Sequence, residues 1–370
     1  MKTNITSLEL HCLIKELKFL EGARIDNIYN PEKEELIIIF HVPSKGKQIL
    51  RAISGKLLYL SSIKENYGEP SGFCMLLRKH IGNARLKSIS QIESERIVEF
   101  IFEKEEEKKL IIELFGKGNF ILCDADNKVI SALVYHTWKD REIKPKAKYE
   151  KPERAINFLK FELEELEKII NDSELSLIKC LATEIGLGGS YSEEICSLTG
   201  IDKNKDAGKL EEKEIKKIEE NIKKIANKKI EPLIVYEDEQ IKDIVPFELS
   251  IYKNLKNKKL NNYSEAFDYY FLNEHKEEKP KSNAEQEIER LKRRMEKQEE
   301  GITELEKKEK QTRKKAEIIY NNYKLIDEIL TELKKASEKH SWEEIKKKID
   351  GHKIVKSINT KDKTAEIEVT

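Results

Sequence analysis

The feature that most constrains the fold of this chain is a heptad repeat over residues 284 to about 336. Apolar side chains recur there in steps of three and four residues, which is the spacing of a coiled-coil seam. A helix of about 50 residues is about 75 Å long, so the segment predicts a rod. The seam comprises Ile288, Leu291, Met295, Gln298, Ile302, Leu305, Glu309, Thr312, Ala316, Ile319, Tyr323, Ile326, Leu330 and Leu333.

Three polar residues, Gln298, Glu309 and Thr312, weaken the middle of this seam and predict a partly exposed or flexible arm. A helix of this length needs an antiparallel partner, which the chain does not supply. Residues 353–370 instead predict the hairpin-like start of a small β element. We therefore expect an outgoing coiled-coil helix at 281–337, an incomplete tip domain at 338–370, and a chain truncated before the return helix.

Residues 1–155 predict an α+β domain with a mostly antiparallel sheet. Thr6 and Glu9 form a capping box before a helix with leucines at helical spacing. Pro70 and Ser71 precede a second helix, which we expect Gly82 and Asn83 to end as a left-handed cap. Strand-like runs occupy 24–30, 35–42, 47–54, 56–62, 96–102, 108–115 and 120–124.

Residues 156–280 form the second predicted domain, which is helical to about Ala226. Two of its helices meet at the glycine-rich turn Gly186–Gly189. After the helices, residues 232–249 predict a β-hairpin and residues 263–275 a closing helix.

The composition restricts the kinds of site that the chain can carry. Lys and Arg total 70, as do Asp and Glu, so a polyanion site requires local segregation of charge. The scattered cysteines and histidines predict a reducing cytoplasm, with no disulfide framework, metal site or cofactor. No signal peptide or membrane span is expected. The cysteines are Cys12, Cys74, Cys123, Cys180 and Cys196.

Four segments together resemble the NFACT family, which includes NEMF in animals and RqcH in bacteria. They are "SLELHCLIKELKFLEGARIDNIYN", "PSGFCMLLRKHIGNARLKSISQIESERIVEF", "LIIELFGKGNFILCD" and "LATEIGLGGSYSEEIC". The resemblance runs through the whole chain in order. It implies an N-terminal NFACT domain with a glycosylase-like fold, a helix-hairpin-helix domain and the outgoing arm of a coiled coil. We expect an archaeal member that ends before the family's C-terminal NFACT-R domain.

The resemblance implies a role in ribosome-associated quality control. Such factors bind a large ribosomal subunit, through its rRNA, that still carries a stalled peptidyl-tRNA. They recruit tRNA, largely tRNA-Ala in bacteria and archaea, for untemplated tailing of the nascent chain. The ribosome performs the peptidyl transfer, so the resemblance does not imply an enzyme.

The family's signature residues are an Asp-Arg pair at the start of a strand and an Asp in the first helix, all implicated in tRNA recruitment. They fall on Glu95, Arg96 and Glu9, so both acids are Glu here. Glu9 also has a purely structural interpretation as the acid of the capping box. Arg96 begins a row that continues as Val98 and Phe100, where a guanidinium is well placed to meet phosphate or a base edge.

A basic stretch and the glycine turn are further candidates for contacts with the RNA backbone. Arg78, Lys79 and His80 close a helix, where cations also offset the helix dipole, and Arg85 and Lys87 follow them. Gly186, Gly188 and Gly189 resemble the phosphate-binding hairpin of formamidopyrimidine-type DNA glycosylases, although a tight turn needs glycine for its own sake.

Two other functions compete with the tRNA-binding hypothesis. One is a nucleic-acid repair enzyme on the glycosylase-like scaffold, but those enzymes use an N-terminal proline followed by an acid, and this chain has Lys2 and Thr3. The other is a surface adhesin, because some bacterial relatives carry a fibronectin-binding label. The absence of a signal peptide and of paired cysteines argues against an adhesin.

Overall fold

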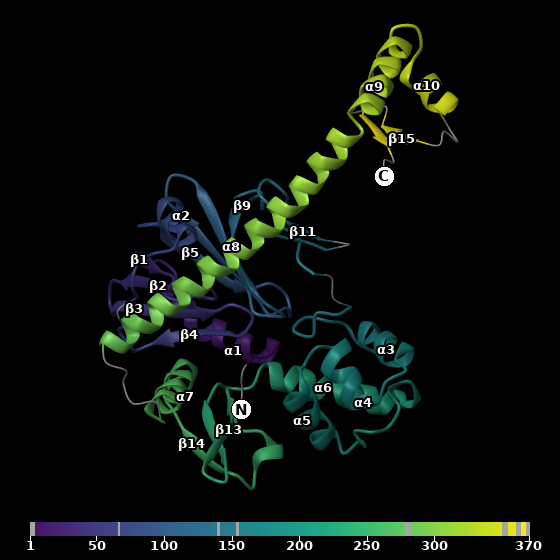
Figure 1. Ribbon diagram of the computed structural model, residues 1–370. Helices are drawn as coiled ribbons and strands as arrows, with labels where there is room; N and C mark the ends of the chain where they lie inside the picture. The colour runs from purple at the N-terminus through teal and green to yellow at the C-terminus, as the bar shows by residue number, and fades with distance from the viewer. Residues whose placement is uncertain are drawn as a thin grey trace. The chain divides into compact units, whose positions relative to one another are not determined.

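The computed structural model of the chain describes residues 4–65, 67–138, 141–152, 155–277, 283–349, 354–359 and 364–367. The fold has two compact units, Met1–Glu277 and Glu278–Thr370 (Figure 1). Within the described ranges, no helix is both long enough and apolar enough to cross a membrane.

A nine-stranded sheet dominates the first unit, with the order β4-β3-β2-β1-β5-β6-β7-β8-β9. Every neighbouring pair in it is antiparallel, which confirms the predicted sheet type. The strands are β1 (Arg24–Tyr29), β2 (Glu35–Val42), β3 (Gly46–Ile53), β4 (Leu57–Ser61), β5 (Arg85–Gln91), β6 (Ile97–Glu103), β7 (Glu107–Glu113), β8 (Asn119–Asp124) and β9 (Val129–Ala132).

Side chains alternate between the two faces of this sheet. Val98 and Phe100 of β6 are buried in the largest hydrophobic cluster, to which three helices contribute. These are α1 (Ser7–Leu17), α2 (Gly72–Ile81) and α7 (Tyr263–Glu277). Ile97 is buried in a smaller cluster on the other face, with Ile143 and Tyr149. The small hairpin of β10 (His136–Thr137) and β11 (Glu142–Ile143) leads into that second cluster.

The helical part of the first unit follows the sheet and has its own hydrophobic cluster. A three-stranded sheet of order β13-β12-β14 completes it, with one strand more than the predicted hairpin. The elements are α3 (Leu163–Asp172), α4 (Leu177–Lys179), the π-helical turn η2 (Cys180–Glu184), α5 (Gly189–Thr199), the 3-10 turn η3 (Ala207–Lys209), α6 (Glu212–Ala226), β12 (Leu233–Glu237), β13 (Gln240–Val245), the 3-10 turn η4 (Ser250–Tyr252) and β14 (Lys256–Lys259); a further 3-10 turn, η1 (Lys18–Leu20), follows α1.

The second unit contains α8 (Asn283–Asn321), α9 (Tyr323–Ser337), α10 (Trp342–Ile349), β15 (Val355–Asn359) and β16 (Thr364–Ile367). Leu333 of α9, Ile345 of α10 and Val355 of β15 form a small buried cluster. Strands β15 and β16 pair in an antiparallel hairpin, as the sequence predicts. Along α8, described seam residues such as Leu305 are exposed, so the predicted coiled coil stays a prediction.

The predicted unbroken helix is wrong at one position, because Asn322 separates α8 from α9. Its φ of −107° and ψ of 18° are not helical, and its side-chain amide donates to the Ile318 carbonyl at 2.9 Å. A side chain that bonds its own backbone in this way competes with the helix. The predicted left-handed cap of α2 is confirmed at Asn83, with φ 61°, whereas Gly82 has φ −60°.

Gly82 is needed for a reason other than a left-handed conformation. A Cβ at this position would lie 2.3 Å from the Arg78 carbonyl oxygen, which its own N–H approaches at 3.0 Å. At the end of α2, the backbone of Gly82 therefore passes so close to the Arg78 carbonyl that no side chain fits there.

Candidate functional site

The turn from Ile92 to Arg96 presents two of the predicted site residues at the start of β6. The Arg96 carbonyl accepts from the Leu114 N–H at 2.8 Å, so the backbone pairs with the end of β7 before the strand formally begins at Ile97. Glu93 supplies the turn with a positive φ of 51°. The Glu95 side chain is buried and that of Arg96 is half-buried. Glu95 and Arg96 thus project from the edge of the sheet at which β6 begins and β7 ends.

Glu9 lies near this turn but is buried, with 1% of its surface exposed. Its Oε2 accepts from the Thr6 N–H at 2.8 Å, and Thr6 Oγ1 accepts from the Glu9 N–H at 3.3 Å, so the predicted capping box is present. Its Oε1 accepts from the Tyr191 hydroxyl at 3.0 Å. These internal bonds make Glu9 a residue that positions the helix α1 against α5.

Side-chain bonds hold the 92–96 turn against the first turn of α1. The amide of Gln91 donates to the Ser7 carbonyl at 3.0 Å and to the Glu95 carbonyl at 2.9 Å. The Ser7 hydroxyl donates to the Ser94 carbonyl, and the Ser94 hydroxyl donates to the Ile156 carbonyl at 3.3 Å. The structure therefore packs the turn of Glu95 and Arg96 against the helix turn that carries Glu9, although the two segments are about 90 positions apart.

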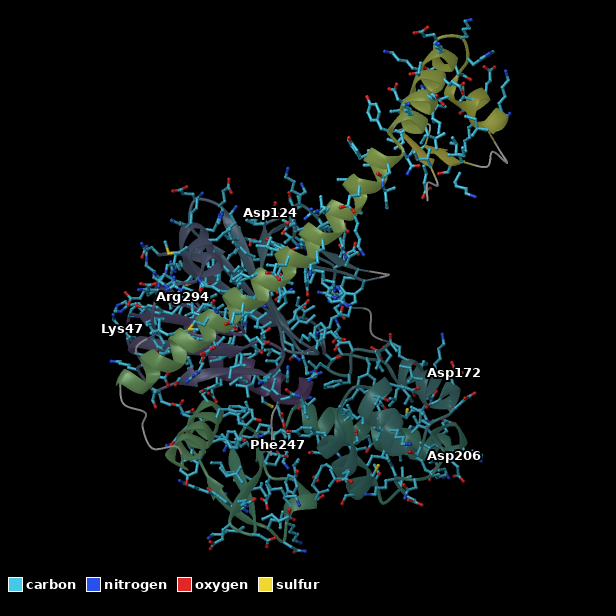
Figure 2. The ribbon with its side chains drawn as sticks, viewed as in Figure 1. Lys47, Asp124, Asp172, Asp206, Phe247 and Arg294 are labelled. Carbon is cyan, nitrogen blue, oxygen red and sulfur yellow. The ribbon has the colours of Figure 1, made fainter. Side chains whose placement is uncertain are left out.

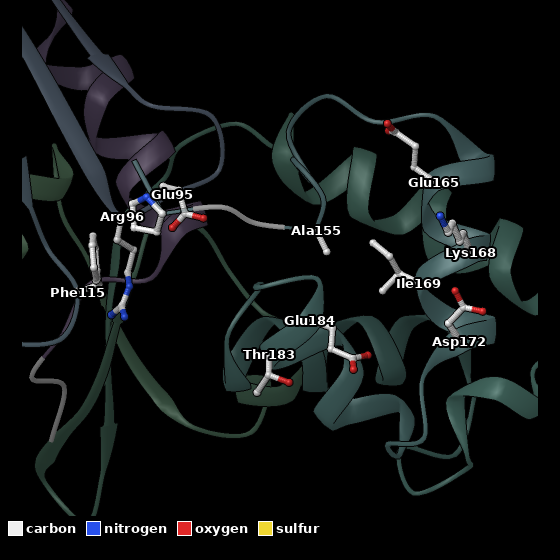
Figure 3. Close-up of a pocket in the computed structure, with 11 residues that line it drawn as sticks. Glu95, Arg96, Phe115, Ala155, Glu165, Lys168, Ile169, Asp172, Thr183 and Glu184 are labelled. Atoms are coloured by element: carbon white, nitrogen blue, oxygen red, sulfur yellow. The ribbon is translucent and has the colours of Figure 1, made fainter. Parts of the chain in front are cut away.

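Glu95 and Arg96 form one wall of a cleft of about 880 Å³ in the first unit. Figure 3 shows Arg96 beside Phe115 on that wall, and Glu165, Lys168 and Asp172 of α3 across the opening. Thr183 and Glu184, from the π-helical turn, complete the lining together with Pro152, Ala155 and Ile169. The lining carries four carboxylates and two cations, so the cleft offers both hydrogen-bond acceptors and charged donors.

Sequence reasoning misses the α3 wall of the cleft. The signal was present in the capping box of Glu162 and Glu165, which fixes where α3 begins. What the sequence does not show is that this charged helix faces Arg96 from about 70 positions away. Asp172, at the end of α3, is labelled in Figure 2.

The basic stretch lies at the opposite end of the sheet from Arg96. Arg85 pairs with Glu103, while Gln91, at the other end of β5, pairs with Val98. Six residues of strand separate the two ends by about 20 Å. Arg85 donates to the Gly22 carbonyl at 3.2 Å, and Lys87 forms a 2.6 Å ion pair with Glu107.

The last turn of α2 belongs to that far end as well. Arg78 Nε donates to the Ile28 carbonyl at 2.7 Å, and Lys79 is exposed. Burial lowers the pKa of His80, and the charges of Lys108, Lys79 and Lys104 lower it further. Lys104 and Lys108 flank the β6–β7 turn, so the basic stretch and Arg96 are separate surfaces.

The glycine turn lies beside the N-terminus of α1 instead. Gly188, with φ 82°, is the N-cap of α5, and a Cβ there would lie 3.2 Å from Cγ2 of Thr6. Gly186 also has a positive φ, and Gly189 is exposed. Close packing on Thr6 thus accounts for Gly188, and a contact with RNA phosphate stays a prediction.

The Tyr191 side chain connects α5 to α1 through its hydrogen bond to Glu9. Complete burial raises the pKa of its hydroxyl well above the ordinary value, and the nearby Glu9 charge raises it further. Its ring packs edge to face on Phe247, with the centroids 6.2 Å apart. The hydroxyl therefore stays protonated and remains a donor to the Glu9 carboxylate.

The described residues contain no group of three or more His, Cys, Asp or Glu side chains arranged to hold a metal ion. All five cysteines are free and buried. Burial raises the pKa of the Cys12 thiol to about 12, so this thiol is not poised as a nucleophile.

Comparison with known proteins identifies the family. The model of the NFACT N-terminal and middle domains matches residues 6–366. The archaeal Rqc2 homolog aRqcH of Methanocaldococcus jannaschii is 34% identical, covering 95% of this chain and 55% of that relative. The human ribosome quality control complex subunit NEMF is 31% identical, covering 39% of this chain and 14% of its own length. The chain thus spans about half the length of the archaeal relative.

Solved structures show the same fold at lower sequence identity. The fibrinogen binding protein from Staphylococcus aureus matches with a TM-score of 0.61 and 19% identity, covering 72% of this chain and 98% of that one. The N-terminal part of the fibronectin/fibrinogen-binding protein from Streptococcus suis matches with a TM-score of 0.59 and 23% identity, covering 73% and 100%. From the extent of the family match and the archaeal relative, this chain belongs to the NFACT family.

Proposed function

We propose that this chain is the tRNA-recruiting part of a ribosome-associated quality control factor. In this role it binds the large ribosomal subunit that carries a stalled peptidyl-tRNA, and brings in tRNA, with tRNA-Ala as the leading candidate, for untemplated tailing. The names of its relatives, an archaeal Rqc2 homolog and NEMF, support the quality-control role. The ribosome supplies the peptidyl-transfer chemistry in the cytoplasm, and this chain supplies positioning.

The observation that carries the proposal is the cleft in which Arg96 projects beside Glu95 (Figure 3). Both belong to a turn whose backbone Gln91 and Ser7 hold in place, so the point from which the guanidinium projects is fixed. The opposite wall carries Lys168 between Glu165 and Asp172. Such a mixed wall repels an unbroken row of phosphates and favours groups that have both donors and acceptors.

Nucleobase edges have this mixed character. An arginine fork matches the O6 and N7 acceptors of guanine, and a carboxylate accepts from the exocyclic amine of cytosine. Sequence-specific RNA recognition mostly uses unpaired bases in loops. We therefore propose that Arg96 and the cleft carboxylates contact unpaired bases of tRNA, while exposed lysines elsewhere contact the backbone.

The test compares Arg96→Ala and Arg96→Lys with a Lys216→Ala control, whose ammonium forms an ion pair with Glu212 on α6. We expect Arg96→Ala to lose about 2 kcal/mol of tRNA-binding free energy, with an unchanged melting temperature. Arg96→Lys keeps the charge but lacks the fork, so it recovers only part of the affinity. Lys216→Ala keeps full affinity.

Cosedimentation with isolated large ribosomal subunits, followed by sequencing of the bound tRNA, tests the partner and the tRNA-Ala assignment. Enrichment of tRNA-Ala that depends on Arg96 supports the proposal. A lower melting temperature for Arg96→Ala, with unchanged affinity per folded molecule, shows instead that Arg96 is structural.

A further inference from the structure

The small β10–β11 hairpin carries exposed aromatic side chains that the proposed cleft does not use. Tyr135 is 51% exposed and Trp138 45% exposed, and His136 is exposed as well. The rings of His136 and Trp138 stack with centroids 4.1 Å apart and an interplanar angle of 18°. None of the hydrophobic clusters among the described residues includes Trp138. Folding of the core therefore does not explain these rings.

The buried ion pair of Arg141 and Glu113 lies against the exposed Trp138 ring. The Arg141 guanidinium lies 5.2 Å from the Trp138 ring centroid and bonds to the Glu113 carboxylate. The Tyr149 hydroxyl donates to the same carboxylate at 3.0 Å. In addition, the backbone N–H of Trp138 donates to the Arg141 carbonyl at 2.7 Å, which closes the turn of the hairpin. The ring thus has a fixed support.

The same end of the sheet carries the hairpin and Arg96. The Leu114 N–H bonds to the Arg96 carbonyl, and Glu113 pairs with Asn119 in β8. The Asn119 side chain then bonds both the N–H and the carbonyl of Val134, at 3.1 and 2.8 Å. Three steps between neighbouring strands amount to about 14 Å, so one RNA loop can reach both places.

Positive charge is concentrated in the segment of sequence that contains the hairpin, although the whole chain is neutral. Residues 128–151 contain seven Lys or Arg and three Asp or Glu. Lys128 and Lys148 face each other in an isolated β-bridge, and Lys146 donates its N–H to the Val129 carbonyl beside them at 2.8 Å. These three lysines are exposed and form no ion pair within the described part of the chain. The lysines lie toward the far end of β9, because the Lys128 N–H bonds to Asp124, which pairs with Lys108. Exposed aromatic rings together with cations farther along one surface are the composition of a surface for unpaired RNA.

We propose that the His136–Trp138 stack is a platform on which an unpaired RNA base stacks, with Lys128, Lys146 and Lys148 bound to phosphates farther along the same RNA strand. This rests on the proposed function and specifies the RNA element: a loop with an unstacked base. The rings are already stacked and supported in the free protein, so binding requires little ordering. A docking surface for another protein needs no such lysine row, and charge complementarity favours RNA.

Tryptophan fluorescence tests the platform directly, because the chain has two tryptophans, Trp138 and Trp342. A Trp342→Phe background leaves Trp138 as the only reporter. One probe RNA is a hairpin with a seven-nucleotide unpaired loop, and the other is the same stem as a blunt duplex. We expect the looped RNA to quench Trp138 emission and the duplex to leave it unchanged. Unchanged emission while anisotropy of labelled looped RNA shows binding overturns the proposal.

Substitutions distinguish the contribution of the Trp138 ring to RNA binding from that of the three lysines. Trp138→Leu is expected to lower affinity for the looped RNA roughly tenfold, whereas Trp138→Phe keeps most of it and neither affects the duplex. Lys128→Ala, Lys146→Ala and Lys148→Ala together are expected to reduce the salt dependence of binding to both RNAs. The matched control replaces Lys209, Lys216 and Lys223, which are held in ion pairs on the helical part. Equal affinity of Trp138→Leu and the unsubstituted protein for looped RNA also overturns the proposal.

Arg96→Ala, measured on the same two RNAs, distinguishes this inference from the proposed function. If the platform is right and the cleft is wrong, looped RNA still quenches Trp138 emission and Arg96→Ala does not change this quenching. If the cleft is right and the platform is wrong, Arg96→Ala lowers RNA affinity and Trp138→Leu does not.

Discussion

The Tyr191 hydroxyl donates a 3.0 Å hydrogen bond to the Glu9 carboxylate, across 182 positions of sequence. The same carboxylate caps α1 through the Thr6 N–H. One buried charge therefore fixes both the start of the first helix and its contact with α5. Because the turn that carries Glu95 and Arg96 is bonded to Ser7 in that helix, this charge also sets the geometry of the cleft wall.

Tyr191→Phe removes one donor from this buried carboxylate. We expect a loss of about 2 kcal/mol in the free energy of unfolding, since the bond is to a charged group and no water replaces it. Urea denaturation measures the change. Glu9→Gln is the companion variant: if it weakens tRNA binding at unchanged stability while Tyr191→Phe does not, Glu9 acts on RNA rather than on the fold.

Gly118 and Gly116 form a matched pair in the turn between β7 and β8. Both have positive φ, 66° and 57°, but a Cβ on Gly118 would lie 1.8 Å from the Gly55 nitrogen, whereas a Cβ on Gly116 meets nothing within 4 Å. Gly116→Ala therefore carries only conformational strain, about 1 kcal/mol. Gly118→Ala must also separate two backbones, and we expect more than about 4 kcal/mol. Equal melting temperatures for the two variants would contradict this packing.

The Glu113–Arg141 pair is buried at the base of the aromatic hairpin. Burial raises the pKa of Glu113, and the Arg141 charge opposes the rise. Arg141→Leu leaves the carboxylate without its cation, so we expect a loss of about 3–5 kcal/mol at neutral pH. The double variant Glu113→Leu with Arg141→Leu should recover most of that loss, as thermal denaturation can show. A double variant as unstable as the single one would indicate that packing, not charge, dominates.

His11 on α1 should make stability depend on pH. Burial, with a smaller contribution from Lys15, lowers its pKa to about 4 from 6.5. The unfolded chain therefore binds a proton near pH 6.5 while the folded chain does not, so stability present above that pH is lost as pH falls toward 4. Since His11 is only half-buried, we expect a loss of about 1 kcal/mol between pH 7 and 5. His11→Asn removes this contribution, and identical pH profiles for the two proteins would refute it.

How far the sequence leads depends on whether a signal is local. The capping box of Thr6 and Glu9 is a four-residue pattern, and the structure confirms it. Strand β5 was missed because a bulge at Lys87 shifts the register between Leu86 and Ser88 and breaks the expected alternation. Strand β14 was missed because its side chains are exposed and mostly lysine, and only its pairing with β12 makes it a strand.

The candidate site was predicted only in part for the same reason. Glu95 and Arg96 are adjacent in sequence, so their joint position follows from one strand start. The burial of Glu9 against Tyr191 depends on a contact between segments 182 positions apart, and the α3 wall depends on how two separate clusters pack. Periodicity reports which side of an element is apolar, not which other element covers it.

The described seam residues of α8 are exposed, which allows a prediction in which position, rather than residue type, decides the outcome. Leu305 of α8 is 66% exposed, whereas Leu333 of α9 is 8% exposed and packs with Ile345 and Val355. Both are seam leucines by sequence. Leu305→Glu should therefore change the stability of this chain by less than about 0.5 kcal/mol.

Leu333→Glu, in contrast, places a charge in the small cluster of the second unit and should cost about 3 kcal/mol. Circular dichroism melts of the full chain at several concentrations measure both effects. If Leu305→Glu lowers the helix content and the loss grows with protein concentration, the seam is already paired in a second copy of the chain. A concentration-independent result, with only Leu333→Glu destabilised, leaves the α8 seam available for another helix, as its heptad spacing predicts.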